Sequence, residues 1–287
     1  MSKLKARMAP YAMILPGGLW LAVFFVVPIG AMASLSLQQG DLFSGFRQTF
    51  HFHTYVDVIT QYHDQLVRSF LYGLSTTIIA IVLAYPIAYW IATRGGRHKS
   101  TYLFLILLPF FVTFVLRTIA WQFLLADNGI VLSPLKDAHV LPADFHILAT
   151  SVAVVGGLVY NFLPFMVLPI YVALERIDRS LLEAANDLYA SRSQAFLRVV
   201  LPLSLPGVFA GVVLTFVPAT SDYVNATILG GTGQVMIGNI IETLFIENQD
   251  YPQAAALSWV LLTALLIGVF AYARALGTEE VLEVSAA

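Results

Sequence analysis

The stretch LLEAANDLYASRSQAFLRVVLPLSLPG, residues 181–207, is polar and mixed in charge, yet it lies between two apolar blocks. In its first part, apolar side chains recur at the spacing of a helix face, and acidic and amide side chains take the other face. This pattern predicts a short amphipathic helix that lies beside a membrane instead of crossing it. The apolar positions are Leu181, Leu182, Ala185, Leu188 and Tyr189, and the polar ones are Glu183, Asn186 and Asp187.

The composition of the whole chain indicates an integral membrane protein. Of 287 residues, 59% are hydrophobic and 11% are charged, and the mean hydropathy is +0.80. Soluble domains carry about 25% charged residues. The net charge of -2 points to no nucleic-acid partner, and the absence of cysteine excludes disulfides and thiolate metal sites.

Six apolar blocks are long enough to cross a bilayer, which takes about 20 residues each. Their bounds are roughly 11–35, 70–93, 101–125, 146–174, 203–226 and 254–275. The first block is too long for a signal peptide, so we expect it to be a retained span. Prolines within several blocks predict kinked helices. The expected fold class is an all-α membrane protein with one membrane domain, 11–276, between a short N-terminus, 1–10, and a tail, 277–287.

Basic residues predict the orientation of these spans. With a cytoplasmic N-terminus, 11 of the 15 basic residues fall on the cytoplasmic side, three fall outside, and Arg117 lies within a span. The positive-inside rule expects this asymmetry, with both termini cytoplasmic. It also places residues 181–207 in the cytoplasm. The outer segments hold nine carboxylates, among them Asp41, Asp57 and Asp250, which either concentrate a cation there or serve solubility.

Ionisable and aromatic residues near the membrane are candidates for a substrate path. Asp222, in the segment SDYVNATILGG, is either a path residue or a carboxylate at a helix end. For Arg117 we favour a structural ion pair with a carboxylate over contact with a ligand. Aromatic side chains either bind an ammonium group through cation–π contact or form an interfacial belt. The candidate path residues are Asp222, Tyr223, Asn225, Glu242, Arg117, Trp121 and Asp127.

Catalytic and cofactor motifs are missing from the sequence. The six histidines do not form a metal-ligand pattern, so we expect no metal site. There is no glycine-rich phosphate loop with a lysine, so the sequence offers no motif for ATP hydrolysis by this chain. We therefore expect no enzymatic activity and no cofactor bound by this chain.

Residues in the 181–207 stretch resemble the EAA loop of permease subunits of ABC importers, the cytoplasmic segment that docks onto the ATPase. Tyr189 departs from the family pattern, because it stands where the loop has its glycine and a tight turn. The resemblance implies an ATPase-coupling role for Glu183, Ala184, Ala185, Asp187, Tyr189, Ala190, Ser191, Arg198 and Pro202.

Most of the chain, and above all residues 221–257, is similar to spermidine/putrescine importer permeases of the B or H type. This implies a type I ABC importer (MetI-like) fold in a bacterial inner membrane. The implied partners are a second permease of the C or I type, two ATPase subunits that bind ATP and Mg, an extracytoplasmic polyamine-binding protein and membrane lipid. An importer for an opine, an amino-acid derivative, another organic cation or an anion remains the alternative.

Overall fold

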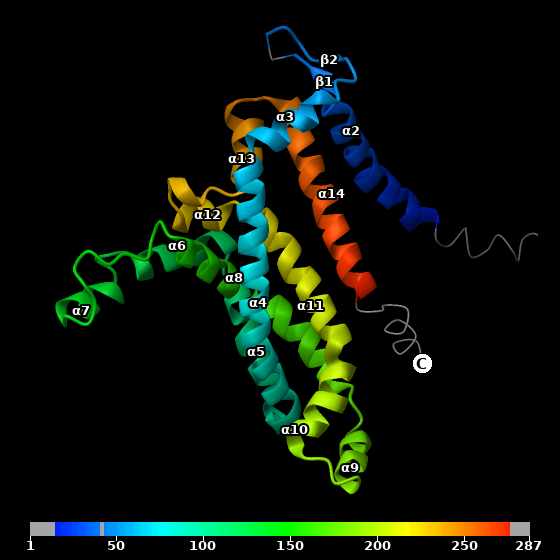
Figure 1. The fold of residues 1–287 in the computed structure, drawn as a ribbon, viewed down its shortest axis with the longest axis vertical. Coiled ribbons are helices and arrows are strands. Elements are labelled where there is room, and N and C mark those ends of the chain that lie inside the picture. The colour runs from blue at the N-terminus through cyan, green and yellow to red at the C-terminus, as the bar shows by residue number, and fades with distance from the viewer. Residues whose placement is uncertain (1–14, 41–42, 276–287) are drawn as a thin grey trace, which may run out of the picture. The chain divides into compact units, whose positions relative to one another are not determined.

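The structure is a computed structural model that describes residues 15–40 and 43–275 (Figure 1). Most of these residues are helical, which confirms the all-α prediction. One β-ribbon was not foreseen: β1 (Gln38–Gln39) pairs antiparallel with β2 (Arg47–Gln48). The expected terminal segments, 1–10 and 277–287, and Asp41 lie outside the described residues.

Helices follow one another along the described chain, with 3₁₀ and π segments labelled η. They are η1 (Ala22–Val26), α2 (Val27–Leu35), α3 (His53–Gln61), α4 (His63–Arg94), η2 (Gly96–His98), α5 (Lys99–Leu107), η3 (Leu108–Phe111), α6 (Phe114–Leu125), α7 (Leu132–Asp137), α8 (Ser151–Glu175), α9 (Arg179–Asp187), α10 (Arg192–Ala195), η4 (Phe196–Val200), α11 (Leu201–Ser221), α12 (Val224–Leu229), η5 (Thr232–Gln234), α13 (Ile237–Glu242), η6 (Thr243–Glu247) and α14 (Tyr251–Ala275).

The chain divides into two compact units. The first holds residues up to 63 together with 241–263, and the second holds residues 64–240 and those from 264 onward. In the first unit, the Ser36 and Tyr55 hydroxyls are hydrogen-bonded at 2.6 Å, and the Phe46 and Tyr251 rings lie 5.4 Å apart. These contacts tie the β-ribbon region to α3 and to the start of α14.

The second unit is built around α4, α8 and α11. Small residues recur every four positions on α4, which gives this helix a flat apolar side. The buried cluster comprises Ala80, Ala84, Ala88 and Ala92 of α4, Met166, Val167, Ile170 and Leu174 of α8, Val200 of η4 and Val208 of α11. A Cβ atom added at Gly207 of α11 would lie 2.5 Å from the Pro169 carbonyl oxygen of α8, so this glycine allows the two backbones to approach closely.

Candidate membrane spans agree in number with the prediction. Five described stretches are long and apolar enough to cross a membrane: Leu15–Leu35, His63–Arg94, Ser151–Glu175, Arg192–Ser221 and Tyr251–Ala275. A sixth span would be a bent pair, Gly96–Phe111 and Phe114–Leu125, whose two helical arms meet at 90°.

Several of the expected span boundaries differ from the helices, most clearly in the third and fourth spans. The expected third span, 101–125, breaks where Val112 and Thr113 adopt extended backbone, with ψ of 137° and 146°. The expected fourth span begins at Ser151 instead of 146. There the Thr150 side chain caps α8 by accepting a hydrogen bond from the Ala153 amide at 3.3 Å.

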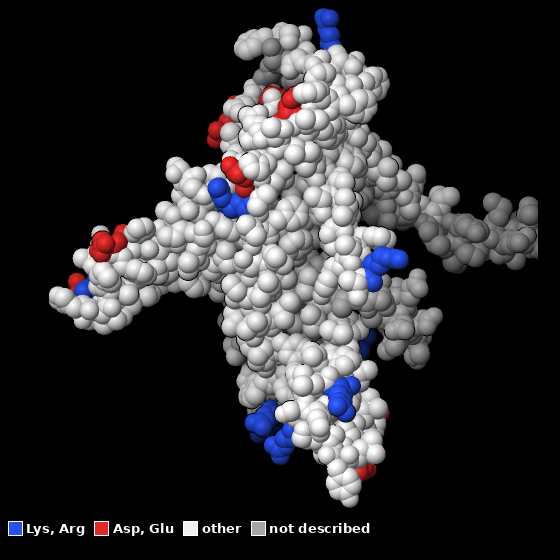
Figure 2. All heavy atoms as spheres, viewed as in Figure 1, with Lys and Arg blue, Asp and Glu red and all other residues white. Residues whose placement is uncertain are grey.

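Basic side chains gather at the end of the second unit where α5, α9 and α10 lie (Figure 2). Exposed members of this group are Arg94, Arg97, Arg176, Arg192 and Arg198. The segment around α7, elsewhere in the same unit, carries the exposed carboxylates Asp127, Asp137 and Asp144. The gathering of arginines at one end of the second unit is the asymmetry of basic residues expected from the sequence.

Candidate functional site

The predicted amphipathic helix is α9, which begins after Asp178 (Figure 1). Asp178 is the N-cap, and its carboxylate accepts a hydrogen bond from the Ser180 amide at 2.9 Å. This hydrogen bond favours the ionised form and lowers the pKa of Asp178 below its usual value. A carboxylate at this position also suits the positive end of the helix dipole.

Only part of the predicted apolar face of α9 is turned inward. Leu182 and Ala185 are half-buried, and Leu182 packs on the α4–α8–α11 cluster. Leu188 and Tyr189 lie beyond Asp187, the last residue of α9, and are 82% and 97% exposed, so they do not extend the apolar face of the helix. Glu183, Ala184 and Asp187 are exposed on α9. The loop therefore presents carboxylates, small residues and two large apolar side chains to the surroundings.

Tyr189 takes up the left-handed conformation that its family-typical glycine would adopt. Its φ is +57°, and its amide donates to the Asn186 carbonyl at 2.9 Å. The Ala190 amide donates to the Ala185 carbonyl at 3.0 Å. These two hydrogen bonds form a Schellman motif, whose C′ position favours glycine. The tight turn is thus present despite the tyrosine.

The rest of the loop is fixed by a second cap and by aromatic packing. The Ser191 hydroxyl accepts from the Gln194 amide at 3.3 Å, and the Gln194 side chain accepts from the Ser191 amide at 2.8 Å, so the two form a capping box. Phe196 of η4 packs edge-on against Tyr85 and Tyr89 of α4, at ring distances of 5.8 and 5.6 Å. Among the remaining loop candidates, Arg198 and Pro202 are exposed.

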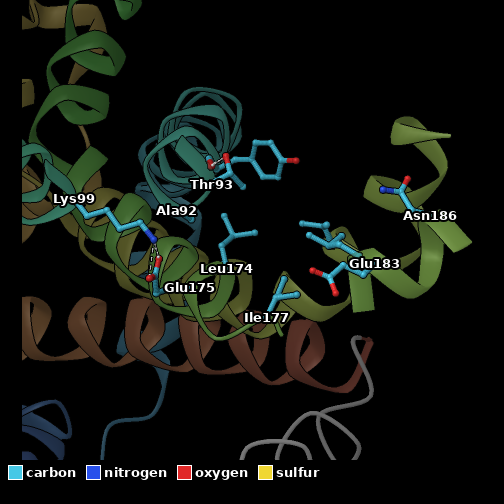
Figure 3. A pocket seen from close by; sticks show the side chains of 11 residues that line it. Ala92, Thr93, Lys99, Leu174, Glu175, Ile177, Glu183 and Asn186 are labelled. Carbon is cyan, nitrogen blue, oxygen red and sulfur yellow. Dashed lines mark hydrogen bonds and ion pairs between the residues drawn. The ribbon is translucent and has the colours of Figure 1, made fainter. Parts of the chain in front are cut away.

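A cavity of about 310 Å³ separates α9 from the ends of α4, α5 and α8 (Figure 3). Lys99 and Glu175 close one side through an ion pair, with Lys99 Nζ 2.7 and 2.8 Å from the two carboxylate oxygens. Glu183 and Asn186 come from α9 on another side. Sequence reasoning missed this ion pair, because its residues lie 76 positions apart. The cavity leaves α9 with contacts on only part of its inner face.

Of the candidate path residues, the structure brings two into a buried polar cluster. Asp222 ends α11 in an extended conformation, and its Oδ1 accepts from the Asn225 amide at 2.7 Å and from Asn225 Nδ2 at 3.2 Å. The Asn225 side-chain oxygen accepts from Asn161 Nδ2 of α8 at 3.2 Å, and that same nitrogen is 3.2 Å from the Thr118 hydroxyl of α6. Asp222 therefore lies at a helix end, and the expected fifth span, 203–226, is interrupted there.

Asn161 and Thr118 were not predicted as site residues. Asn161 is a lone amide in the apolar run GGLVYNFLPF, and this pattern could have predicted a buried polar contact at that position. Its Oδ1 is buried and makes no hydrogen bond within the described part of the chain. The cluster joins α6, α8 and α12 by polar contacts between buried groups, which are costly to leave unpaired.

Arg117 lies next to this cluster but has no ion pair among the described residues, so the expected carboxylate partner is wrong. It is 7% exposed, and its Nε and Nη1 make no hydrogen bond there. Its guanidinium instead lies over the Phe110 ring, with Cζ 4.5 Å from the ring centre, and 5.8 Å from that of Phe114. Cation–π contact is the interaction that the structure provides for it.

The other candidate path residues have different surroundings. Trp121 of α6 packs edge-on against Tyr160 of α8 at 5.3 Å, while Tyr223 is 46% exposed. Asp127 forms an ion pair with Lys136 at 3.0 Å. Glu242 belongs to the first unit and is half-buried at the end of α13.

Residues 58–276 match the family described as binding-protein-dependent transport system inner membrane component. The chain is 35% identical over 259 residues to the spermidine/putrescine transport system permease protein PotB of Haemophilus influenzae, covering 89% of this chain and 90% of that protein. It is 33% identical over 257 residues to PotB of Escherichia coli strain K12, covering 89% and 94%.

Two solved structures share the fold at lower sequence identity. A bacterial ABC transporter for import of the acidic polysaccharide alginate aligns with a TM-score of 0.72 and 18% identity, covering 96% of this chain and 97% of that one. The MetNI methionine ABC transporter, in an inward-facing conformation, aligns with a TM-score of 0.54 and 16% identity, covering 74% and 94%.

Proposed function

The chain belongs to the binding-protein-dependent inner membrane components, the permease subunits of ABC importers, and on this premise we propose that it forms half of a translocation path for polyamines. The observation that supports polyamines as the solute is the sequence identity of 33–35% to PotB proteins over 89% of the chain. These proteins are named as permeases of spermidine/putrescine transport systems. A second permease of the C or I type would supply the other half of the path.

The proposed coupling element is the loop from α9 to the start of α11. Its exposed Glu183, the exposed Leu188 and the small Ala184 suit docking into a groove of an ATPase subunit, which would bind ATP and Mg. The arginine-rich end of the second unit supports a cytoplasmic position for this loop, and both termini would lie on the same side. A loaded extracytoplasmic binding protein would approach from the opposite side.

Alternating access requires two arrangements of the permease pair, one open to each side of the membrane. Nucleotide and the loaded binding protein would each shift the equilibrium between them. The ATPase subunits would move α9, and α9 would pass that movement to α8 and α11, which lie on either side of it in the sequence. The family pattern at Tyr189 is preserved in backbone shape, which supports this coupling role.

One observation favours a different solute. Arg117 has buried guanidinium nitrogens and no carboxylate partner among the described residues, which would suit an anionic group on a solute. An importer for an opine, an amino-acid derivative or an anion is therefore the second candidate. It requires the same fold and the same partners, and differs only in ligand chemistry.

Stimulation of ATP hydrolysis decides between these candidates. The complex with its second permease, ATPase subunits and binding protein is reconstituted in proteoliposomes, and the binding protein is offered spermidine, putrescine or an anionic control such as an opine. We expect stimulation with spermidine or putrescine only. Stimulation by the anionic control alone would contradict the polyamine proposal and leave the importer class intact.

A further inference from the structure

Arg117 bridges the break in the bent pair of helical arms. Phe110 belongs to the arm Gly96–Phe111, and Phe114 and Arg117 belong to the arm Phe114–Leu125, which meets the first at 90°. The guanidinium carbon is 4.5 Å from the centre of the Phe110 ring and 5.8 Å from that of Phe114. One cation thus contacts an aromatic ring on each side of the break.

Both rings are held in place by residues other than Arg117. Phe110 packs edge-on against Phe165 of α8 at 5.2 Å, and Phe114 packs against Phe162 of α8 at 6.1 Å. The aromatic pair is therefore anchored to α8 on both sides of the break. It does not depend on the guanidinium for its position.

The arginine, by contrast, has few partners of its own. Its buried Nε and Nη1 make no hydrogen bond, and no carboxylate lies within ion-pair distance among residues 15–40 and 43–275. An unpaired cation inside a membrane bundle is costly and usually marks a functional position. The rings of Phe110 and Phe114 are the cation–π partners of this side chain among the described residues.

We propose that Phe110 and Phe114 form a binding site for an alkylammonium group and that Arg117 fills this site while no solute is present. The inference rests on the proposed function, because it requires a cationic solute. An arriving primary or secondary ammonium would take the place of the guanidinium between the rings. The site would then keep one positive charge at all times, so that a fixed arginine does not repel the polycation.

The break between the two helical arms would couple replacement of Arg117 by an ammonium group to a change in the fold. Val112 and Thr113 are extended and exposed, so the two arms are joined by a short non-helical link. Departure of Arg117 would remove a contact that spans this link. Occupancy of the aromatic site and the bend between the arms are therefore expected to change together.

The test compares spermidine affinity in variants of the complete complex by equilibrium dialysis. Arg117→Gln is expected to tighten binding about threefold to tenfold, because it removes the competing cation. Arg117→Lys should stay within about twofold of the native complex, since it keeps a cation on the same helix. Phe110→Leu and Phe114→Leu should each weaken binding by roughly threefold or more. Phe104→Leu, on the same arm, and Arg94→Gln are matched controls and should change nothing.

A second readout needs no solute. The chain has no cysteine, so Val112→Cys places a single thiol in this subunit at the break. Adding Arg117→Gln should raise its labelling rate by a maleimide, and adding Arg94→Gln should not. Weaker spermidine binding in Arg117→Gln, or labelling that is indifferent to it, would overturn the proposal. If the native complex takes up no spermidine, the proposed function fails; if it does and all variants bind alike, this inference alone fails.

Discussion

At the scale of single residues, Tyr189 adopts the left-handed backbone conformation that glycine favours, although it is not a glycine. Its left-handed φ of +57° closes the Schellman motif after α9, while its side chain is almost fully exposed. An L-residue in this conformation carries a strain of about 1–2 kcal/mol. The large exposed ring is therefore retained at a local cost in stability, next to the surface that we assign to the ATPase.

Replacement of Tyr189 by glycine should stabilise the turn by about 1 kcal/mol, because glycine adopts positive φ without a Cβ clash. Hydrogen exchange at the amides of residues 189 and 190 should slow about fivefold. Tyr189→Ala is the matched control, since it removes the ring and keeps the Cβ. Equal slowing in both variants would mean that the ring, and not the backbone, is the source of the strain.

Asp178 gives α9 a dependence on pH. Because the Ser180 amide lowers its folded-state pKa, the cap contributes stability above the unfolded-state pKa and loses it as pH falls through the folded value. Protection of the Ser180 amide, corrected for intrinsic exchange, should therefore decline below about pH 4. Asp178→Asn, which caps without titrating, should show protection that does not vary with pH. A parallel decline in that variant would exclude the carboxylate as the cause.

At the scale of elements, the coupling loop connects α8 and α11, which pack closely against each other. Their close approach depends on Gly207, where an added Cβ would meet the Pro169 carbonyl oxygen and the Ala173 side chain, both at 2.5 Å. Backbone atoms cannot yield as a flexible side chain can. The loop between these helices therefore starts and ends on a rigid pair.

Gly207→Ala should lower the stability of the subunit by about 1–3 kcal/mol, because the new methyl group forces the two helices apart. Gly156→Ala, on α8, has nothing within 4 Å of the new Cβ and should instead raise stability by about 0.5–1 kcal/mol through helix propensity. Thermal unfolding of the purified complex measures both. Changes of the same sign would contradict the packing argument.

Glu183 is one of the exposed carboxylates of α9. Glu183→Arg should reduce uptake by more than about tenfold, because it reverses a charge on the surface that we propose docks onto the ATPase. The subunit should still reach the membrane, since Glu183 is exposed and caps nothing. Glu247→Arg, an exposed position in the first unit, is the control. Uptake that is normal in Glu183→Arg would refute the coupling role of this face.

At the scale of the whole molecule, charge and the position of α9 predict which side of the membrane each loop faces. The chain lacks cysteine, so single thiols can be placed at Leu188, after α9, and at Ile130, before α7, both 82% exposed. An impermeant maleimide should label Leu188→Cys only in inside-out vesicles and Ile130→Cys only in right-side-out vesicles. Leu132→Cys, 1% exposed, should resist labelling in both. Labelling of both exposed sites from one side would reverse the orientation argument.

The sequence could predict the elements of this molecule because apolar runs and helical spacing are local patterns. The spans, the helix from Arg179 to Asp187 and the arginine-rich end all followed from such patterns. Prolines predicted kinked helices, and Pro109 shortly precedes the break at Val112. The apolar run 101–125 did not show that the helix would stop there and continue at 90°. The end of α9 at Asp187 was not predicted either, because the apolar pattern continues through Leu188 and helical spacing alone does not show where a helix ends.

By itself the sequence determined an all-α membrane protein that resembles ABC importer permeases, and it predicted the segment that we assign to the ATPase, because composition, spacing and motif order are properties of neighbouring residues. Only the tertiary structure decided which distant groups meet. It joined Thr118, Asn161 and Asn225 across three helices and set Arg117 over two phenylalanine rings instead of a carboxylate. The physical reason is that contacts between separate helices depend on how those helices pack. The helical spacing of apolar residues within one segment does not show which other helix that segment contacts.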